Sequence, residues 1–225
     1  MFDSPLNLLN LVCGVFSILA SLLIIRKDPG EWLNKALFLC FSCWALNILF
    51  YSLVFYPDIP SEVLNLLRDL NVAFGITAAS FLFLAGQVLM RGDRAVKGRT
   101  AIGLIVLTLV LILTSLLSDR VVATGAQNEI DTTILASLTI FLVPGLVALA
   151  GIVQFVHVRR DLSDPASRKK ILFFITGATS LVAGAFVFGL SGLLIGSEEN
   201  LLVSGLALIL WALGPVFVVW GFYKV

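Results

Sequence analysis

Residues 159–170 read Arg159-Arg160-Asp161-Leu162-Ser163-Asp164-Pro165-Ala166-Ser167-Arg168-Lys169-Lys170, a short polar segment between two long apolar runs. Five of these twelve residues are basic. Lys and Arg are retained on the cytoplasmic side of short loops between membrane spans. We therefore expect this segment to be cytoplasmic, and the side of every other loop follows by counting spans away from it.

The composition is that of an integral membrane protein. Of the 225 residues, 59% are hydrophobic and only 13% are charged, against about 25% charged in an ordinary soluble domain. The net charge is +1, and no basic surface interleaved with aromatic residues is present, so we expect no nucleic-acid partner. The lipid bilayer is the predicted environment.

Seven apolar stretches are long enough to cross a bilayer, which requires about 20 residues. The spans are predicted at about residues 6–25, 32–56, 72–90, 101–117, 133–158, 171–195 and 201–222. The third pattern starts at Ser61 and its first third is polar, so a short interfacial helix over about 61–70 is predicted before that span. The longest connection, 118–132, has room for a short strand and turn at 121–125. The predicted fold class is an all-α seven-helix membrane bundle forming a single domain.

The basic residues sort to one side of this arrangement. If the loops after spans one, three and five and the C-terminus are cytoplasmic, only Arg68 and Arg120 of the 15 Lys and Arg lie outside that side. The orientation rule then places the N-terminus outside and the C-terminus in the cytoplasm. We expect a multi-pass protein of a prokaryotic cytoplasmic membrane.

Catalytic and metal chemistry find little support in the sequence. The single histidine, His157, excludes multi-histidine metal sites and two-histidine haem ligation, and no metal or cofactor is predicted. Ser191 lies in a Gly-Leu-Ser-Gly segment similar to that of intramembrane rhomboid proteases, but His157 is at the opposite membrane face and cannot serve as its base. The Cys40–Cys43 pair is weak as a metal motif. We expect a protein that is not an enzyme.

The remaining polar residues are concentrated in the outer half of the predicted bundle. They are Asn10, Asn47, Tyr51, Arg68, Asp69 and Asn71. Arginine and amide groups are suited to binding a small polar or anionic ligand by directed hydrogen bonds. Two interpretations stay open: these residues form a ligand site, or they act as interhelical hydrogen bonds and interfacial charges.

Other features predict contacts and bends. The inner basic residues offer a docking face for a cytoplasmic protein partner, and they are Arg159, Arg160, Arg168, Lys169 and Lys170. Pro144 and Pro215 each remove a backbone hydrogen bond and are expected to kink spans five and seven. Small residues recur along span six, from Ser180 and Gly184 onward, and allow a neighbouring backbone in this chain or in a second copy to approach closely.

The order of these features resembles the N-terminal seven-helix membrane region of prokaryotic histidine kinases. The likeness lies in the basic end of span one, Trp44-Ala45-Leu46 in span two, the turn with Arg68, the Arg159 to Lys170 segment, and the exit Gly221-Phe222-Tyr223-Lys224. The resemblance implies a receptor-like module. Because the chain stops at Val225 without a kinase domain, it further implies signalling through a separate partner.

Three functions are compatible with the sequence. The leading hypothesis is a non-enzymatic membrane sensor that binds a small ligand in the outer half of the bundle and signals to a cytoplasmic or membrane partner. The second is a structural or accessory subunit of a membrane complex. The third is a transporter or channel for a small solute.

Overall fold

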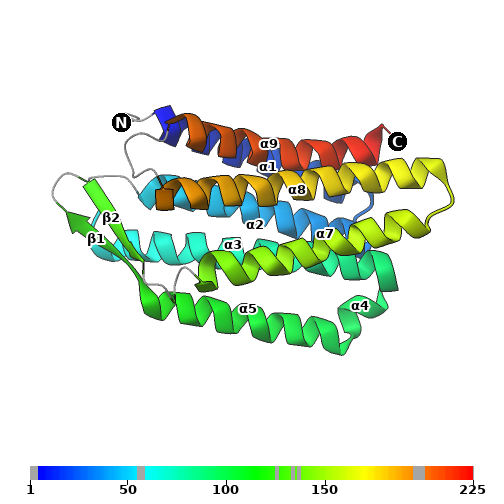
Figure 1. The fold of residues 1–225 in the computed structure, drawn as a ribbon, viewed down its shortest axis with the longest axis horizontal. Helices are drawn as coiled ribbons and strands as arrows, with labels where there is room; N and C mark the ends of the chain where they lie inside the picture. The colour runs from blue at the N-terminus through cyan, green and yellow to red at the C-terminus, as the bar shows by residue number, and fades with distance from the viewer. Residues whose placement is uncertain are drawn as a thin grey trace.

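The computed structural model describes residues 5–54, 59–124, 127–132, 135, 138–194 and 201–224. These residues form long helices packed side by side, with one four-residue helix, α4, between two of them (Figure 1). They are α1 (Pro5–Lys27), α2 (Trp32–Val54), α3 (Ser61–Arg91), α4 (Arg94–Lys97), α5 (Arg99–Ser118), α7 (Val143–Asp161), α8 (Pro165–Leu194) and α9 (Leu201–Tyr223), with a π-helical turn η1 (Leu138–Leu142) before α7.

Seven helices within the described residues are long and apolar enough to cross a membrane. A helix that is apolar around most of its circumference is suited to the interior of a large protein or to a bilayer. The exposed side chains of α5 are almost all aliphatic, including Ile102, Ile105, Leu109 and Leu113, as lipid contact requires. The prediction of a multi-pass membrane bundle is confirmed.

A β-hairpin connects α5 to the next helix. Strands β1 (Asp119–Thr124) and β2 (Gln127–Thr132) pair antiparallel, from Asp119 opposite Thr132 to Thr124 opposite Gln127. The hairpin lies at the same end of the bundle as the N-terminus (Figure 1). The fold is therefore helical in its spans, with a small sheet in the connection where the sequence predicted a strand and turn.

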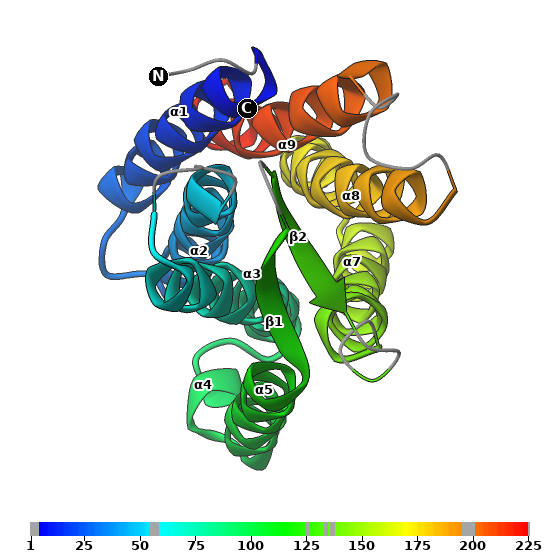
Figure 2. The same cartoon turned by 90° about the vertical axis from the view of Figure 1, so that its left-hand side faces the viewer.

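The contacts between helices close α1, α2, α3, α7, α8 and α9 into a ring of six, and α5 lies outside it (Figure 2). Around the ring, α1 packs against α2, α2 against α3, α3 against α7, α7 against α8, α8 against α9, and α9 back against α1. Helix α5 packs chiefly on α3 and is the least buried of the seven spans. The ring brings the first and last spans together.

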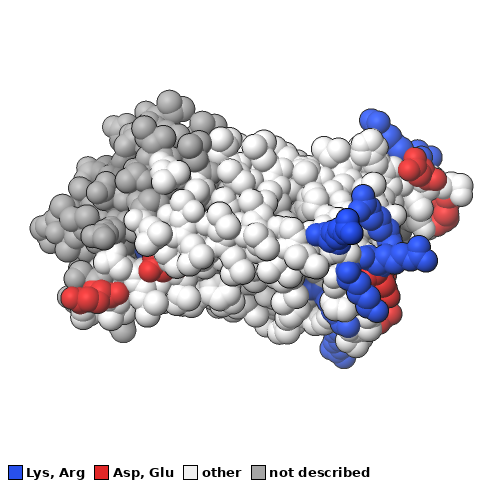
Figure 3. Space-filling model, turned by 90° about the horizontal axis from the view of Figure 1, so that it is seen from below, with Lys and Arg blue, Asp and Glu red and all other residues white. Residues whose placement is uncertain are grey.

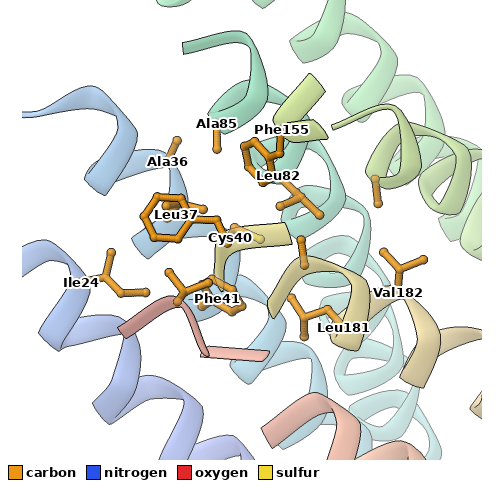
Figure 4. Close-up of a cluster of buried hydrophobic side chains, with 14 of the residues drawn as sticks. Ile24, Ala36, Leu37, Cys40, Phe41, Leu82, Ala85, Phe155, Leu181 and Val182 are labelled. Carbon is orange, nitrogen blue, oxygen red and sulfur yellow. The ribbon is translucent and has the colours of Figure 1, made fainter. Parts of the chain in front are cut away.

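The core of the ring is apolar and contains side chains from all six of its helices. Figure 4 shows Ile24 of α1, Leu37 and Phe41 of α2, Leu82 of α3 and Phe155 of α7 directed toward one another. All five side chains are buried. In a bilayer their burial does not remove apolar surface from water, so close packing is the main source of their stabilising contribution.

Small residues bring α8 and α9 into close contact. A Cβ atom placed on Gly177 would lie 2.5 Å from the carbonyl oxygen of Gly214 and 2.8 Å from a Val218 methyl group. One turn further along, the Ser180 hydroxyl donates to the Leu210 carbonyl oxygen at 2.5 Å. In the described part of span six, the small residues thus pack against α9 of the same chain.

Helix α3 differs from its prediction. It runs without a break through all 31 residues from Ser61 to Arg91, so a separate interfacial helix over 61–70 does not exist. The polar residues that indicated a boundary instead lie on a continuous helix, and Arg68 and Asn71 among them are buried. Buried hydrogen bonds satisfy these side chains without interrupting the backbone.

Two other spans begin at different residues from those expected. Helix α8 starts at Pro165 rather than near residue 171, because its first turn is polar and therefore carried no hydropathy signal. In span five, the π-helical turn η1 ends just before α7, and Pro144 is the second residue of α7 rather than a mid-helix residue. Pro215 lies inside α9, as expected.

Charged side chains are distributed unevenly between the two ends of the bundle. We call the end that carries the α1–α2, α3–α5 and α7–α8 connections and the C-terminus the basic end, and the other the hairpin end. Figure 3 shows most Lys and Arg gathered at one end, where acidic residues also lie among them, and an uncharged belt between this end and the acidic residues at the other. The charge asymmetry predicted from the sequence is present on this face.

Candidate functional site

A buried polar cluster joins α2 to α3 toward the hairpin end. We call it the Arg68 cluster, and it comprises Arg68, Asn71 and Asn47. Arg68 is only 6% exposed and Asn71 only 3%. An ionisable side chain buried in a membrane bundle is costly, and such residues commonly mark functional sites.

Reciprocal hydrogen bonds hold the two asparagines together. The Asn47 side-chain amide donates to the Asn71 carbonyl oxygen at 2.7 Å, and the Asn71 amide donates to the Asn47 carbonyl oxygen, also at 2.7 Å. The space for Asn47 is provided by Gly75, where a Cβ atom would come within 2.9 Å of the Asn47 amide nitrogen. This geometry fixes the distance between α2 and α3 at one level of the bundle.

Arg68 extends this pair into a network. Its Nη1 donates to the side-chain oxygen of Asn71 at 2.7 Å, one turn along the same helix. Asn71 therefore uses its amide for α2 and its oxygen for Arg68, and each side-chain atom has a different partner. A ligand that bound the guanidinium would act directly on the residue that links α3 to α2.

Tyr51 lies beside this network. It follows Asn47 by one turn on α2, is half-buried, and lies within electrostatic reach of the Arg68 guanidinium. Asp69 follows Arg68 on the same helix and is also half-buried. The structure brings Asn47, Tyr51, Arg68 and Asn71 together.

Asn10 is placed elsewhere. It is buried on α1, which packs against α2 and α9. Its carboxamide oxygen has no hydrogen-bond partner among the described residues. The neighbouring Cys13 thiol donates to the Leu208 carbonyl oxygen of α9 at 3.8 Å, so this side of α1 faces the last helix rather than the Arg68 cluster.

The predicted docking residues divide into two groups at the basic end. Arg160, Arg168 and Lys169 are exposed and available to a partner. Lys170 is instead half-buried over the rings of Phe174 and Phe222, 5.9 and 4.7 Å from their centroids. Arg159 is also half-buried, and its Nε has no partner in the described part of the chain. Lys170 thus helps to join α8 to α9.

Asp164 lies in this basic segment and caps the N-terminus of α8. Its carboxylate accepts a hydrogen bond from the Ser167 hydroxyl at 2.6 Å and another from the Ser167 backbone N–H at 2.8 Å. Pro165 follows at the first helical position, where its missing N–H costs nothing. Asp-Pro-Ala-Ser is a favourable N-terminal capping sequence, which explains why the helix starts six residues before the predicted span.

The capping bonds predict a pH response at the start of α8. The hydrogen bonds from Ser167, with a smaller one from the Ala166 N–H, hold the pKa of the Asp164 carboxyl below its ordinary value. Because the folded-state pKa is lowered, the charged carboxylate stabilises the cap fully at pH values above the unfolded pKa of about 3.9. This stabilisation is lost as the pH falls through the folded-state pKa. We expect the amide groups of Ala166 and Ser167 to lose protection against hydrogen exchange, relative to their intrinsic exchange rates, as the pH falls through that range. Asp164→Asn, which caps without titrating, should remove the pH dependence; an unchanged pH profile would contradict the assignment.

Several polar contacts in the bundle were not predicted. The Ser21 and Ser42 hydroxyls lie 2.8 Å apart between α1 and α2, and the Tyr223 hydroxyl donates to the Leu23 carbonyl oxygen at 2.9 Å. Gln87 is buried on α3. Polar residues are therefore present toward the basic end too, contrary to the expectation that they concentrate in the outer half. The spacing of Cys13, Ser17 and Ser21 along one face of α1 is a signal that could have indicated part of this pattern.

Metal chemistry has no candidate in the described residues. No group of three His, Cys, Asp or Glu side chains lies close enough together there to hold a metal ion. The thiols of Cys13, Cys40 and Cys43 are free and buried.

Comparison with known proteins gives no family for the chain. No protein-family model matches it, and no curated protein is similar to it. The geometry of the Arg68 cluster and of the basic end therefore provides the basis for a functional assignment.

Proposed function

We propose that the protein is a membrane receptor-like module that binds a small anionic or polar ligand at the Arg68 cluster. The observation that carries the proposal is a buried guanidinium inside an apolar bundle that donates from Nη1 to Asn71, the residue that links α3 to α2. An anion can bind the same guanidinium through two parallel hydrogen bonds between opposite charges. Ligand binding would then compete with the Arg68–Asn71 contact.

Helix α3 offers a route from this cluster to the basic end. It is one continuous helix, with Arg68 in its second turn and Arg91 as its last residue. A ligand that alters the Arg68–Asn71–Asn47 contacts would shift α3 relative to α2, and a rigid helix carries such a shift along its length. The exposed Arg160, Arg168 and Lys169 would then provide a docking face for a cytoplasmic partner.

The resemblance to the membrane region of prokaryotic histidine kinases agrees with this proposal. On that basis we further propose a location in a prokaryotic cytoplasmic membrane, with the basic end in the cytoplasm and the N-terminus outside. The sorting of basic residues supports this orientation through the positive-inside rule. A reporter enzyme fused after Val225 should be active in the cytoplasm, and periplasmic activity would contradict it.

The ligand proposal predicts a response that depends on Arg68. We expect at least one of a panel of small carboxylates, phosphate, sulfate and nitrate to raise the thermal midpoint of the purified protein in detergent. Arg68→Gln should abolish that rise. Arg68→Lys should weaken it, because lysine lacks the planar fork that binds an anion through two bonds.

Arg94→Gln provides the matched control, since Arg94 is an exposed arginine at the basic end. It removes the same charge without touching the cluster, so its response to the ligand should equal that of the wild-type protein. If every tested anion changed the thermal midpoints of the wild-type and Arg68→Gln proteins equally, the Arg68 cluster would serve only to hydrogen-bond α2 to α3 and would not be a binding site.

An accessory subunit of a membrane complex is the second candidate. It is favoured by α5, which packs chiefly on α3 and leaves most of its aliphatic side chains exposed. A partner subunit could cover this helix. Co-purification with other membrane proteins in fixed stoichiometry would support this function, whereas a monodisperse lone protomer in mild detergent would count against it.

A further inference from the structure

An open groove runs between α5 and its neighbours α3 and α7. Its volume is about 470 Å³, within the range of about 300–1,000 Å³ typical of ligand sites. Apolar side chains from all three helices line it, including Phe83, Gly103, Leu107, Leu146, Val147 and Ala150. The groove exists because α5 packs on α3 but not closely on α7.

The groove starts near the basic end. On α5 its lining begins at Thr100, the second residue of the helix, and ends at Leu107. At 1.5 Å per residue, this part of the lining extends about 10 Å along the helix. On α7 the lining lies within residues 143–150, in the half of that helix toward the hairpin end, so the groove reaches from the basic end into the middle of the bundle. A molecule in the groove would therefore have one end in hydrocarbon and the other among basic residues.

Basic residues of the α3–α5 connection lie near the end of the groove at Thr100. Arg91 donates from Nη1 to the Thr100 hydroxyl at 3.4 Å, and Arg99 precedes Thr100 in the chain. Arg94 and Lys97 lie on the short helix α4 between them, and Asp93 is the one acidic residue in this segment. The side chains of all five charged residues are exposed. The excess of arginine matches the geometry of a phosphate group, which guanidinium binds through two parallel hydrogen bonds.

We propose that this groove is a binding site for an anionic phospholipid, with an acyl chain between α5 and α7 and the phosphate on Arg91 and Arg99. Basic pockets between membrane helices on one side of a bilayer bind such headgroups. The basic residues Arg91, Arg94, Lys97 and Arg99 near the entrance of the groove favour a lipid phosphate over an apolar protein helix as the occupant.

The experiment compares binding of two lipids with identical chains. Purified protein is incubated with phosphatidylglycerol or phosphatidylcholine in neutral detergent, and retained lipid is counted by native mass spectrometry. We expect the wild-type protein to retain phosphatidylglycerol in preference to phosphatidylcholine. Arg91→Gln/Arg99→Gln should weaken phosphatidylglycerol binding by roughly thirtyfold, since each of the two basic residues contributes about 1 kcal/mol near an anionic group.

A second variant tests the apolar part of the site. A Cβ atom on Gly103 has no atom within 4 Å, so Gly103→Leu can place its side chain in the groove without disturbing the helices. It should lower retention of phosphatidylglycerol while the thermal midpoint without lipid stays unchanged. Because Gly103→Leu leaves every basic residue in place, it tests the contact with the acyl chain separately from the contact with the phosphate.

Two controls match these changes in kind. Gly205 of α9 also has open space at its Cβ position, so Gly205→Leu adds the same side chain away from the groove. Arg168→Gln/Lys169→Gln removes two exposed charges at the same end, on α8. Both controls should retain phosphatidylglycerol as the wild-type protein does.

Three results would overturn the proposal. One is equal retention of both lipids by the wild-type protein, which indicates non-specific contact with the belt of helices. Another is unchanged phosphatidylglycerol retention in both groove variants. The third is a wild-type dimer that Gly103→Leu converts to a monomer, which would show that a second copy of the chain occupies the groove.

Discussion

Replacing Gly177 by alanine is expected to lower the free energy of unfolding by about 2 kcal/mol, within the range for overpacked sites. The added methyl group would lie 2.5 Å from the Gly214 carbonyl oxygen and 2.8 Å from a Val218 methyl group. The first of these contacts is with backbone, so side-chain rotation cannot relieve it, and α8 and α9 must separate. Titration with a denaturing detergent in mixed micelles, followed by circular dichroism, would measure the loss.

Gly205→Ala is the matched control because it makes the same substitution on α9. No atom lies within 4 Å of the added Cβ, and alanine is the better helix former by about 1 kcal/mol. We therefore expect the Gly205 variant to be at least as stable as the wild-type protein. Equal destabilisation by the two variants would show that the α8–α9 contact is not limited by backbone approach at Gly177.

Replacing Asn71 by alanine is expected to cost about 2 kcal/mol of stability, since hydrogen bonds to charged groups contribute roughly 1.5–3 kcal/mol. The variant removes both the donor to the Asn47 carbonyl oxygen and the acceptor for the buried Arg68 guanidinium. Asn47→Ala should cost less, about 0.6 kcal/mol, the average for an interhelical hydrogen bond in a membrane. The same detergent titration provides both values.

Two further variants separate the parts of the network. Asn71→Asp keeps an oxygen acceptor for Arg68 but replaces the donor to α2 with a second oxygen. Because its charge pairs with the Arg68 guanidinium, it should be more stable than Asn71→Ala. The double variant Arg68→Ala/Asn71→Ala should be less destabilised than the sum of the two single variants, because the two side chains contact each other. Strict additivity would mean that Arg68 and Asn71 are not energetically coupled.

Hydropathy and charge predicted the seven spans and the sorting of basic residues because both patterns are direct consequences of the bilayer. Boundaries were less accurate where polar residues belong to a helix. Asp164 caps α8 and Arg68 is buried within α3, so each extends a helix into sequence that a hydropathy pattern assigns to a loop or an interface. In both cases local hydrogen bonds satisfy the polar groups.

Part of the candidate site could be predicted for a similar reason. Asn47, Arg68 and Asn71 are unusual residues for apolar helices, which made them conspicuous, and the neighbouring positions of α2 and α3 bring them together. Asn10 was grouped with them by its depth alone, but depth does not determine the direction in which a residue faces around the ring. The serine pair and the groove beside α5 depend on helix order, which composition does not specify.

The closed ring has a consequence for how the protein is made. The Tyr223 hydroxyl donates to Leu23, 200 residues earlier, so the first span meets one of its two neighbours only when the last has been synthesised. At about 5–20 residues per second, α1 waits roughly 10–40 s in the membrane with Cys13 and the rest of the face that receives α9 uncovered. During that interval the nascent chain depends on lipid or on the insertion machinery to shield this face, and translation of the final helix ends that dependence.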